Sequence, residues 1–278
     1  MNNTVKRVIL FIVAIPAIAA IVLYLPQYGH LSVIVILTAV GTLCGFELRS
    51  LLMKAAPPLP LWSAAMPGLV PVLSWTVNMG WLPSAAPTAA MILAVAWALF
   101  DAAFAKETDL GAGFARMASR LLMVMYPGWL IWWTARLTWF DRSGPILLVF
   151  ALAVFINDSA AWLFGVLFGR HRGLFAVSPM KSLEGFLGGA LGSVVVIVGS
   201  SYLFPDALPH PLWQLICFGL VFAAATSLGD LTESVLKRAV GAKDSGKIIL
   251  GRGGMLDSVD SLLFTAPFFV LFIQSAAL

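Results

Sequence analysis

Nine apolar stretches, each long enough to cross a lipid bilayer, make up most of this 278-residue chain. A membrane-spanning helix needs about 20 consecutive apolar residues. Only 11% of the residues are charged, whereas about one-quarter is usual in soluble proteins, so a soluble enzyme is excluded. The sequence therefore predicts an all-α fold, a polytopic integral membrane protein with about nine transmembrane helices. The predicted spans are 8–25, 31–48, 61–79, 86–104, 119–138, 144–168, 185–204, 211–229 and 259–277.

The first stretch follows Lys6 and Arg7 and has the charge pattern of a signal peptide. Its apolar part is longer than a usual signal core, and residues 24–27 do not resemble a small-residue cleavage site. We therefore expect it to be retained as a membrane anchor.

Basic residues indicate the orientation, because loops rich in Lys and Arg stay on the cytoplasmic side. With a cytoplasmic N-terminus and nine spans, all but two of the 17 basic residues fall on the inner side, the exceptions being Arg136 and Arg142. The sequence thus predicts an external C-terminus and, for a bacterial protein, location in the inner (plasma) membrane. The inner set is Lys6, Arg7, Arg49, Lys54, Lys106, Arg116, Arg120, Arg170, Arg172, Lys181, Lys237, Arg238, Lys243, Lys247 and Arg252.

One integral membrane domain is expected over 1–278, because the longest polar stretch, about 230–258, is too short to fold alone. Within it, residues 1–140 supply N-terminal helices, and 144–278 carry most of the polar motifs. The two cysteines, Cys44 and Cys217, lie in apolar runs, which disfavours a disulfide framework or a Cys-rich metal site.

Acidic residues gather between positions 230 and 260, which hold five of the 13 carboxylates. Asp230 and Glu233 are three residues apart, and Asp257 and Asp260 repeat that spacing, which places each pair on one face of a helix. Two such pairs at adjoining helix ends suit a divalent cation such as Mg²⁺, which binds hard oxygen ligands. The alternative for Asp257 is an N-cap or first-turn acid that complements the helix dipole.

A glycine-rich segment, residues 242–255, runs between these acid pairs, and we call it the glycine loop. Glycines 251, 253 and 254 would let backbone N–H groups approach an anion, while Lys243 and Arg252 would neutralise phosphate charge. No strand precedes it and the glycine spacing differs from a Walker A loop. A plain flexible loop with positive-inside charges remains the alternative.

A second polar island interrupts the sixth span at Asn157-Asp158-Ser159 and continues after it as Ser178-Pro179-Met180-Lys181-Ser182. Asp158 in a span needs a partner or a cavity. Lys181 and Ser182 could meet a phosphate at the start of the next helix, where free N–H groups favour anions. Alternatively, Ser178 is an N-cap before Pro179. His171 is expected to be a loop residue at the membrane surface.

Acids for a metal, basic residues for phosphates and an apolar body for a lipid together favour phosphoryl or nucleotidyl transfer to a lipid. A transporter or a non-catalytic membrane partner is the alternative class. The absence of obvious internal repeats and the clustering of acids on one face count against it.

Residues 234–261 resemble the signature of the phosphatidate cytidylyltransferases, also called CDP-diacylglycerol synthases, which reads S-x-x-K-R-x4-K-D-x-G-x4-G-H-G-G-x-x-D-R-x-D. Four other features look similar to the family: the polar islands at Asn157 and at Ser178, the run from Ser227 to Glu233, and Glu47. The resemblance covers most of the chain from about 145 onward.

This resemblance implies that CTP and phosphatidate react to give CDP-diacylglycerol and pyrophosphate, with Mg²⁺ and room for a second, monovalent cation. The expected partners are CTP, phosphatidate or a similar lipid phosphate, and membrane lipids, with no nucleic acid and with a homodimer left open. The active site would face the cytoplasm. Carried over by position, the metal carboxylates would be Asp230, Asp257 and Asp260. The catalytic set would add Lys237, Lys243 and Asp244, and the substrate contacts would be Asp158, Ser178, Lys181, Ser182, Arg238, Gly251, Arg252, Gly253 and Gly254.

Three positions depart from the family pattern. Arg252 stands where the family has His, Ser258 where it has Arg, and Met180 where it has Gly. Arg252 keeps a positive charge but does not shuttle protons at physiological pH. We expect Arg252 to offset the charge lost at Ser258. A diverged family member using another lipid phosphate or nucleotide is the alternative reading of these changes.

Overall fold

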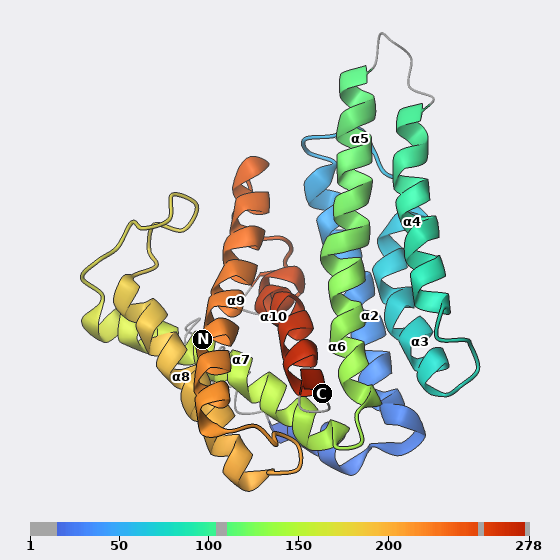
Figure 1. Cartoon of the computed structure of the whole chain (residues 1–278). Helices are drawn as coiled ribbons and strands as arrows, with labels where there is room; N and C mark the ends of the chain where they lie inside the picture. Colours follow the sequence, from blue (N-terminus) through green and yellow to red (C-terminus); the bar gives the residue numbers. More distant parts are fainter. Residues whose placement is uncertain (1–15, 104–109, 250–252, 276–278) are drawn as a thin grey trace.

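The computed structural model describes residues 16–103, 110–249 and 253–275, whose regular structure is helical (Figure 1). Within these ranges the only β-type pairings are two isolated bridges, Arg172 with Ser182 and Ile249 with Gly253. The predicted all-α class is confirmed for the part of the chain that is described.

Five helices are long and apolar enough to cross a membrane, by length and composition. The other predicted spans coincide with helical segments that are shorter or interrupted, so the count of nine stays a prediction. The five are α2 (Gln27–Leu52), α7 (Ser143–Phe168), α8 (Leu183–Leu203), α9 (Leu212–Ala239) and α10 (Leu256–Ser275). The others are residues 16–24, η1 (Leu61–Ala65) with α3 (Met66–Asn78), α4 (Ala86–Ala103), and α5 (Leu110–Met123) with α6 (Leu130–Arg136).

Helices α5 and α6 form one long rod in Figure 1, joined by a π-helical turn, η3 (Val124–Trp129), and closed by η4 (Leu137–Trp139). Pro127 lies inside the turn. Proline has no N–H and its ring clashes with the carbonyl one turn earlier, so a wider turn accommodates it without ending the helix.

The segments that connect the helices lie at two opposite ends of the bundle in Figure 1. Segments after α3, η4 and α8 lie at the lower end, and those after α2 and α9 lie at the upper end. This arrangement brings the upper end of α2 toward the loop between α9 and α10.

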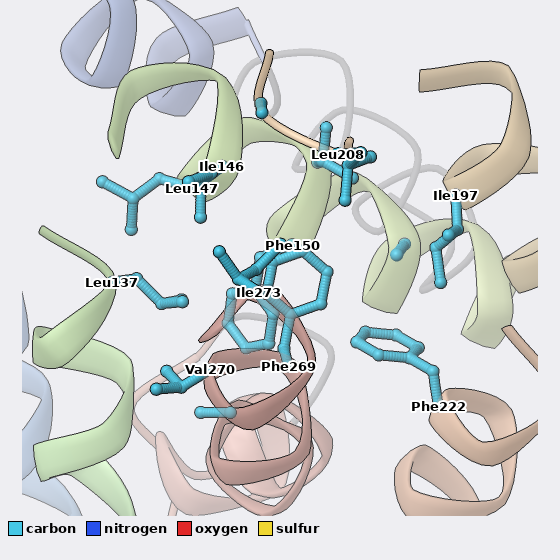
Figure 2. Close-up of a cluster of buried hydrophobic side chains, with 14 of the residues drawn as sticks. Leu137, Ile146, Leu147, Phe150, Ile197, Leu208, Phe222, Phe269, Val270 and Ile273 are labelled. Atoms are coloured by element: carbon cyan, nitrogen blue, oxygen red, sulfur yellow. The ribbon is translucent and has the colours of Figure 1, made fainter. Parts of the chain in front are cut away.

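The largest apolar core lies where α7, α8, α9 and α10 meet (Figure 2). Phe150, Phe222 and Phe269 are buried there, with ring centroids 5.3 Å apart for Phe150 and Phe269 and 6.2 Å apart for Phe150 and Phe222. Tilted and edge-on aromatic contacts of this kind add to the free energy of burial.

Large apolar side chains also point outward from the same helices. Trp162, Val166, Leu187, Leu191 and Val195 are all more than half exposed. A soluble protein rarely exposes so much contiguous apolar surface, whereas lipid covers it in a membrane. The chain is an integral membrane protein.

Helices α7 and α8 pack closely because α8 presents small residues toward α7. A Cβ atom added to Gly188 would overlap the ring of Phe164, and one added to Gly185 would lie 2.8 Å from the carbonyl oxygen of Ala161. Close backbone approach over glycine is a common way for membrane helices to associate. Asn157 fixes the same interface by donating a hydrogen bond to Ser193 Oγ at 2.8 Å.

We expect Gly188→Ala to lower the free energy of unfolding by about 1–3 kcal/mol, because the added methyl group overpacks this interface. Thermal unfolding in detergent measures the effect. Gly199→Ala on the same helix is the matched control, since a Cβ there meets nothing within 4 Å. Equal melting temperatures for the two variants would contradict the close packing at Gly188.

Candidate active site

A pocket of about 510 Å³ opens between α7, the start of α8 and α9, and we call it the α7–α9 pocket. One part of its wall is polar and another part is apolar, with Trp162, Val166 and Phe186 exposed beside it. Such a wall matches a ligand that is charged at one end and apolar at the other. The polar lining residues include Asn157, Asp158, Arg172, Ser178, Lys181, Ser182, Thr226, Ser227 and Asp230.

An ion pair crosses this pocket from the loop before α8 to α9. Lys181 Nζ lies 2.6 Å from Asp230 Oδ2, and the two side chains are 31% and 41% exposed. The structure thus brings together two predicted site residues that are far apart in sequence. Because both remain accessible, each could exchange its partner for a bound phosphate or cation.

The loop of residues 169–182 is shaped by Arg172. Its guanidinium donates to the carbonyl oxygens of Gly165 at 2.9 Å and of Gly169 and Met180 at 3.3 Å. These bonds fold the loop back onto the end of α7 and hold Lys181 over the pocket. His171 lies in this loop, as predicted, with its Nδ1 2.6 Å from Glu184 Oε1.

The cap of α8 corrects the prediction for Ser178. Ser182 is the N-cap residue, and its Oγ accepts a hydrogen bond from Gly185 N at 3.1 Å. The alternative that made Ser178 the N-cap is therefore wrong. Local sequence favoured Ser178 because Pro179 follows it, but residues 178–181 form a turn, and the helix begins only at Leu183, after the extended Ser182.

Asp158 and Asp230 line the pocket, and the carboxyl group of Asp260 is buried on a third helix. The negative charges of Asp230 on α9 and Asp158 on α7 act on the carboxyl group of Asp260 on α10, which is only 6% exposed. Like charges so placed repel one another and require a cation or a proton for balance. Asp158 lines the α7–α9 pocket, so it has the cavity that its place in a span called for.

These carboxylates fit a hard divalent cation. Among the described residues, no three His, Cys, Asp or Glu side chains converge closely enough to hold a metal ion unaided. Mg²⁺, however, is usually held by one or two carboxylates together with substrate phosphates. Asp230 and Asp260 suit that role, so the predicted Mg²⁺ site is compatible with the structure and stays a prediction.

Unlike the other two predicted metal ligands, Asp257 accepts hydrogen bonds from the glycine loop and from Lys237. Its Oδ2 accepts hydrogen bonds from Gly254 N at 2.7 Å, Ser245 N at 2.8 Å and Ser245 Oγ at 2.9 Å. Its Oδ1 accepts from Lys237 Nζ at 2.5 Å. Asp257 lies in the first turn of α10, the position that the first-turn alternative gave it, and its role as a metal ligand stays a prediction.

Lys237 joins α9 to α10 by a double ion pair. Its ammonium contacts Glu233 Oε2 one turn earlier on α9, as well as Asp257. The Glu233 side chain is 1% exposed, and within the described part of the chain its other oxygen, Oε1, lies within hydrogen-bond distance of no donor. Lys237 therefore neutralises two buried acids, a structural role in addition to the predicted catalytic one.

The remaining predicted site residues lie at the end of α9 and in the glycine loop. Arg238, Lys243 and Asp244 are exposed, and Arg238 donates to the Ala242 carbonyl at 3.2 Å. Gly253 N donates to Ile249 O at 3.2 Å. Gly251 and Arg252 lie outside the described residues.

Of the three positions that depart from the family pattern, Met180 and Ser258 lie among the described residues. Met180 is 75% exposed at the pocket wall, and Ser258 Oγ donates to Gly254 O at 3.1 Å, which ties the first turn of α10 to the glycine loop. The expected compensation between Arg252 and Ser258 stays a prediction.

Glu47 and Arg172 were missing from the predicted site residues. Glu47 on α2 is 6% exposed and accepts hydrogen bonds from Ser245 Oγ, Met255 N and Leu256 N. An acid inside an apolar stretch is the same signal that singled out Asp158, and it could have identified Glu47. Arg172 carried no signal beyond its charge.

Comparisons with known proteins agree with the resemblance read from the sequence. The model of a family described as the cytidylyltransferase family matches residues 5–276. Over 134 residues, the chain is 40% identical to the uncharacterized protein YnbB of Escherichia coli (strain K12), covering 48% of this chain and 44% of YnbB. Over 125 residues it is 42% identical to the phosphatidate cytidylyltransferases of Staphylococcus aureus (strain COL) and Staphylococcus epidermidis (strain ATCC 12228), covering 45% of this chain and 47% of each. The matches thus span about half the length of these curated relatives.

Proposed function

The chain belongs to the cytidylyltransferase family, and we propose that it transfers the cytidylyl group of CTP to phosphatidate, giving CDP-diacylglycerol and pyrophosphate. The observation that carries the proposal is the α7–α9 pocket, in which the Lys181–Asp230 pair lies beside an apolar wall. A lipid phosphate needs a charged site of this kind next to a surface open to acyl chains.

In the proposed reaction, a phosphate oxygen of phosphatidate attacks the α-phosphorus of CTP. A new P–O bond forms there while the bond to the bridging oxygen of the β-phosphate breaks and pyrophosphate leaves. A phosphate monoester is already largely ionised near pH 7, so positioning and charge neutralisation matter more than a general base. Lys181 and Arg172 line the pocket and would supply that neutralisation.

Asp230 and Asp260 would hold Mg²⁺, with Asp158 close by to add negative charge. The cation, when bound, would neutralise charge on the phosphates and on the pyrophosphate leaving group. Asp257, one turn before Asp260 on α10, would act by fixing the loop and Lys237.

We also propose nine spans with the N-terminus in the cytoplasm, in a bacterial inner membrane. The segments after α2 and α9, which lie at the same end of the helices in Figure 1, both carry basic residues. Under the positive-inside rule this end, with the glycine loop, faces the cytoplasm, where CTP is found.

The direct test is to incubate the detergent-purified protein with labelled CTP, phosphatidate and Mg²⁺. We expect a labelled CDP-lipid that requires all three components and disappears with a chelator. Folded protein that forms no such product at any Mg²⁺ concentration would refute the proposal.

The departures at Met180 and Ser258 favour a second candidate, a family member with another acceptor or nucleotide. The same assay with other lipid phosphates and with other nucleoside triphosphates distinguishes the two. Faster turnover of phosphatidate after Arg252→His with Ser258→Arg would indicate that these positions set substrate preference.

A further inference from the structure

Three N–H groups of the glycine loop, and that of Leu256 directly after it, are directed at carboxylates of the chain itself. Met255 N donates to Glu47 Oε1 and Leu256 N to Glu47 Oε2, both at 2.8 Å. Ser245 N and Gly254 N donate to Asp257 Oδ2 at 2.8 and 2.7 Å. The sequence had suggested that this loop would offer its N–H groups to substrate phosphate, yet these four donors already have partners.

Glu47 caps α10 from another helix. Met255 directly precedes α10 and Leu256 is its first residue, so both N–H groups belong to the helix end that lacks intrahelical acceptors. A carboxylate there satisfies the donors and complements the helix dipole. Because Glu47 is on α2, 208 positions before Met255, it fixes α10 relative to the N-terminal half of the molecule.

The loop glycines fit against this carboxylate. A Cβ atom on Gly246 would overlap Glu47 Oε1, and the three nearest atoms to it all belong to Glu47. A Cβ on Gly254 would overlap Glu47 Oε2 and Ser245 Oγ. Neither glycine has a positive φ, so what requires glycine at Gly246 is the space taken by Glu47.

Ser245 connects Glu47 with the proposed site. Ser245 is 7% exposed, and its Oγ lies 3.0 Å from Glu47 Oε2 and 2.9 Å from Asp257 Oδ2. A hydroxyl has one hydrogen to donate, so the two carboxylates share it. Asp257 in turn pairs with Lys237, and Asp260 lies one turn further along α10.

We propose that Glu47 is a positioning residue: its carboxylate locks the glycine loop and the first turn of α10, and thereby fixes the positions of Asp257 and, one turn further, Asp260. The contact stands on the geometry alone, while its effect on turnover rests on the proposed function. It follows that substrate phosphates bind the side chains at the pocket and not the four N–H groups held by Glu47 and Asp257.

Limited trypsin digestion in detergent tests whether Glu47 holds the glycine loop in place, and it does not require that the protein turn over CTP. Lys243 and Lys247 are exposed cleavage sites in the glycine loop, and Arg170 is an exposed site in a loop that Glu47 does not contact. We expect Glu47→Gln and Glu47→Ala to raise cleavage at Lys243 and Lys247 about tenfold, since each loses hydrogen bonds to the loop. Cleavage at Arg170 should stay unchanged. Unaltered cleavage of the glycine loop in both variants would overturn the proposal.

A double-mutant cycle gives a sharper test and covers the case in which Glu47→Ala folds poorly. Gly246→Ala alone should raise loop cleavage, because the methyl group displaces Glu47. In the Glu47→Ala background it should add nothing, because the overlapping carboxylate is gone. Additive effects would refute the proposal. Gly199→Ala, in open space on α8, is the control for the glycine substitution.

Kinetics separate positioning from substrate contact. For Glu47→Gln we expect kcat to fall at least about tenfold while the KM for CTP stays within about twofold. A lower KM for CTP in Glu47→Ala would instead mean that the freed N–H groups bind phosphate, which would overturn the proposal. If the native protein turns over no CTP, the proposed function fails, and the digestion experiment still decides whether Glu47 locks the loop.

Discussion

Replacing Asp230 by asparagine should lower kcat for CDP-lipid formation about a thousandfold while leaving the fold intact. Asp230 lies on the pocket wall, pairs with Lys181 at 2.6 Å and acts electrostatically on Asp260. The amide keeps the size of the side chain and an acceptor for Lys181, but it removes the negative charge that a cation requires. Turnover of labelled CTP under saturating substrate measures the loss.

Asp206→Asn is the matched control for this substitution. Asp206 pairs with Arg142 at 3.1 Å in an exposed position, with side chains 61% exposed for Arg142 and 72% for Asp206. The same chemical change there should leave kcat unchanged. If Asp230→Asn retained more than about one-tenth of the native kcat, Asp230 would not be part of the catalytic machinery.

Replacing Lys237 by methionine should lower the free energy of unfolding by about 3–5 kcal/mol, because it leaves buried acids without their counter-charge. Lys237 is 12% exposed and pairs with Glu233 and Asp257, which are 1% and 6% exposed. Chemical denaturation in mixed micelles measures the change. A second substitution, Glu233→Gln, should restore part of the loss by removing one of the two uncompensated charges.

Arg142→Met is the control for Lys237→Met, because it breaks the exposed pair with Asp206. Exposed pairs contribute less than about 1 kcal/mol. If the two methionine variants were equally stable, the buried pairs of Lys237 would not hold α9 against α10.

The helical fold class was predictable because its signals are local. An apolar stretch of sufficient length specifies a helix in a membrane whatever surrounds it, and α2, α7, α8, α9 and α10 all coincide with predicted spans. The acid pairs were predictable for a similar reason, since the spacing from Asp230 to Glu233 and from Asp257 to Asp260 lies within one helical turn. The family followed from a signature that is contiguous in sequence.

Contacts between distant segments were less predictable. The sequence indicated that Lys181 and Asp230 both belong to a polar site, but only the packing of α8 against α9 shows that they pair. It likewise suggested Ser178 as a cap, and the fold uses Ser182. Periodicity shows which face of a helix is polar, and it does not identify the partner of that face.

The glycine loop depends both on its local sequence and on the packing of distant helices. The sequence alone determined that residues 242–255 bring glycines and N–H groups between two acid pairs, and that the chain is a helical membrane protein. Which anion those N–H groups meet depends on helix packing, because Glu47 reaches them from α2, 208 positions before Met255. The physical reason is that a backbone N–H can donate to a carboxylate from any part of the chain, so helix packing selects the partner.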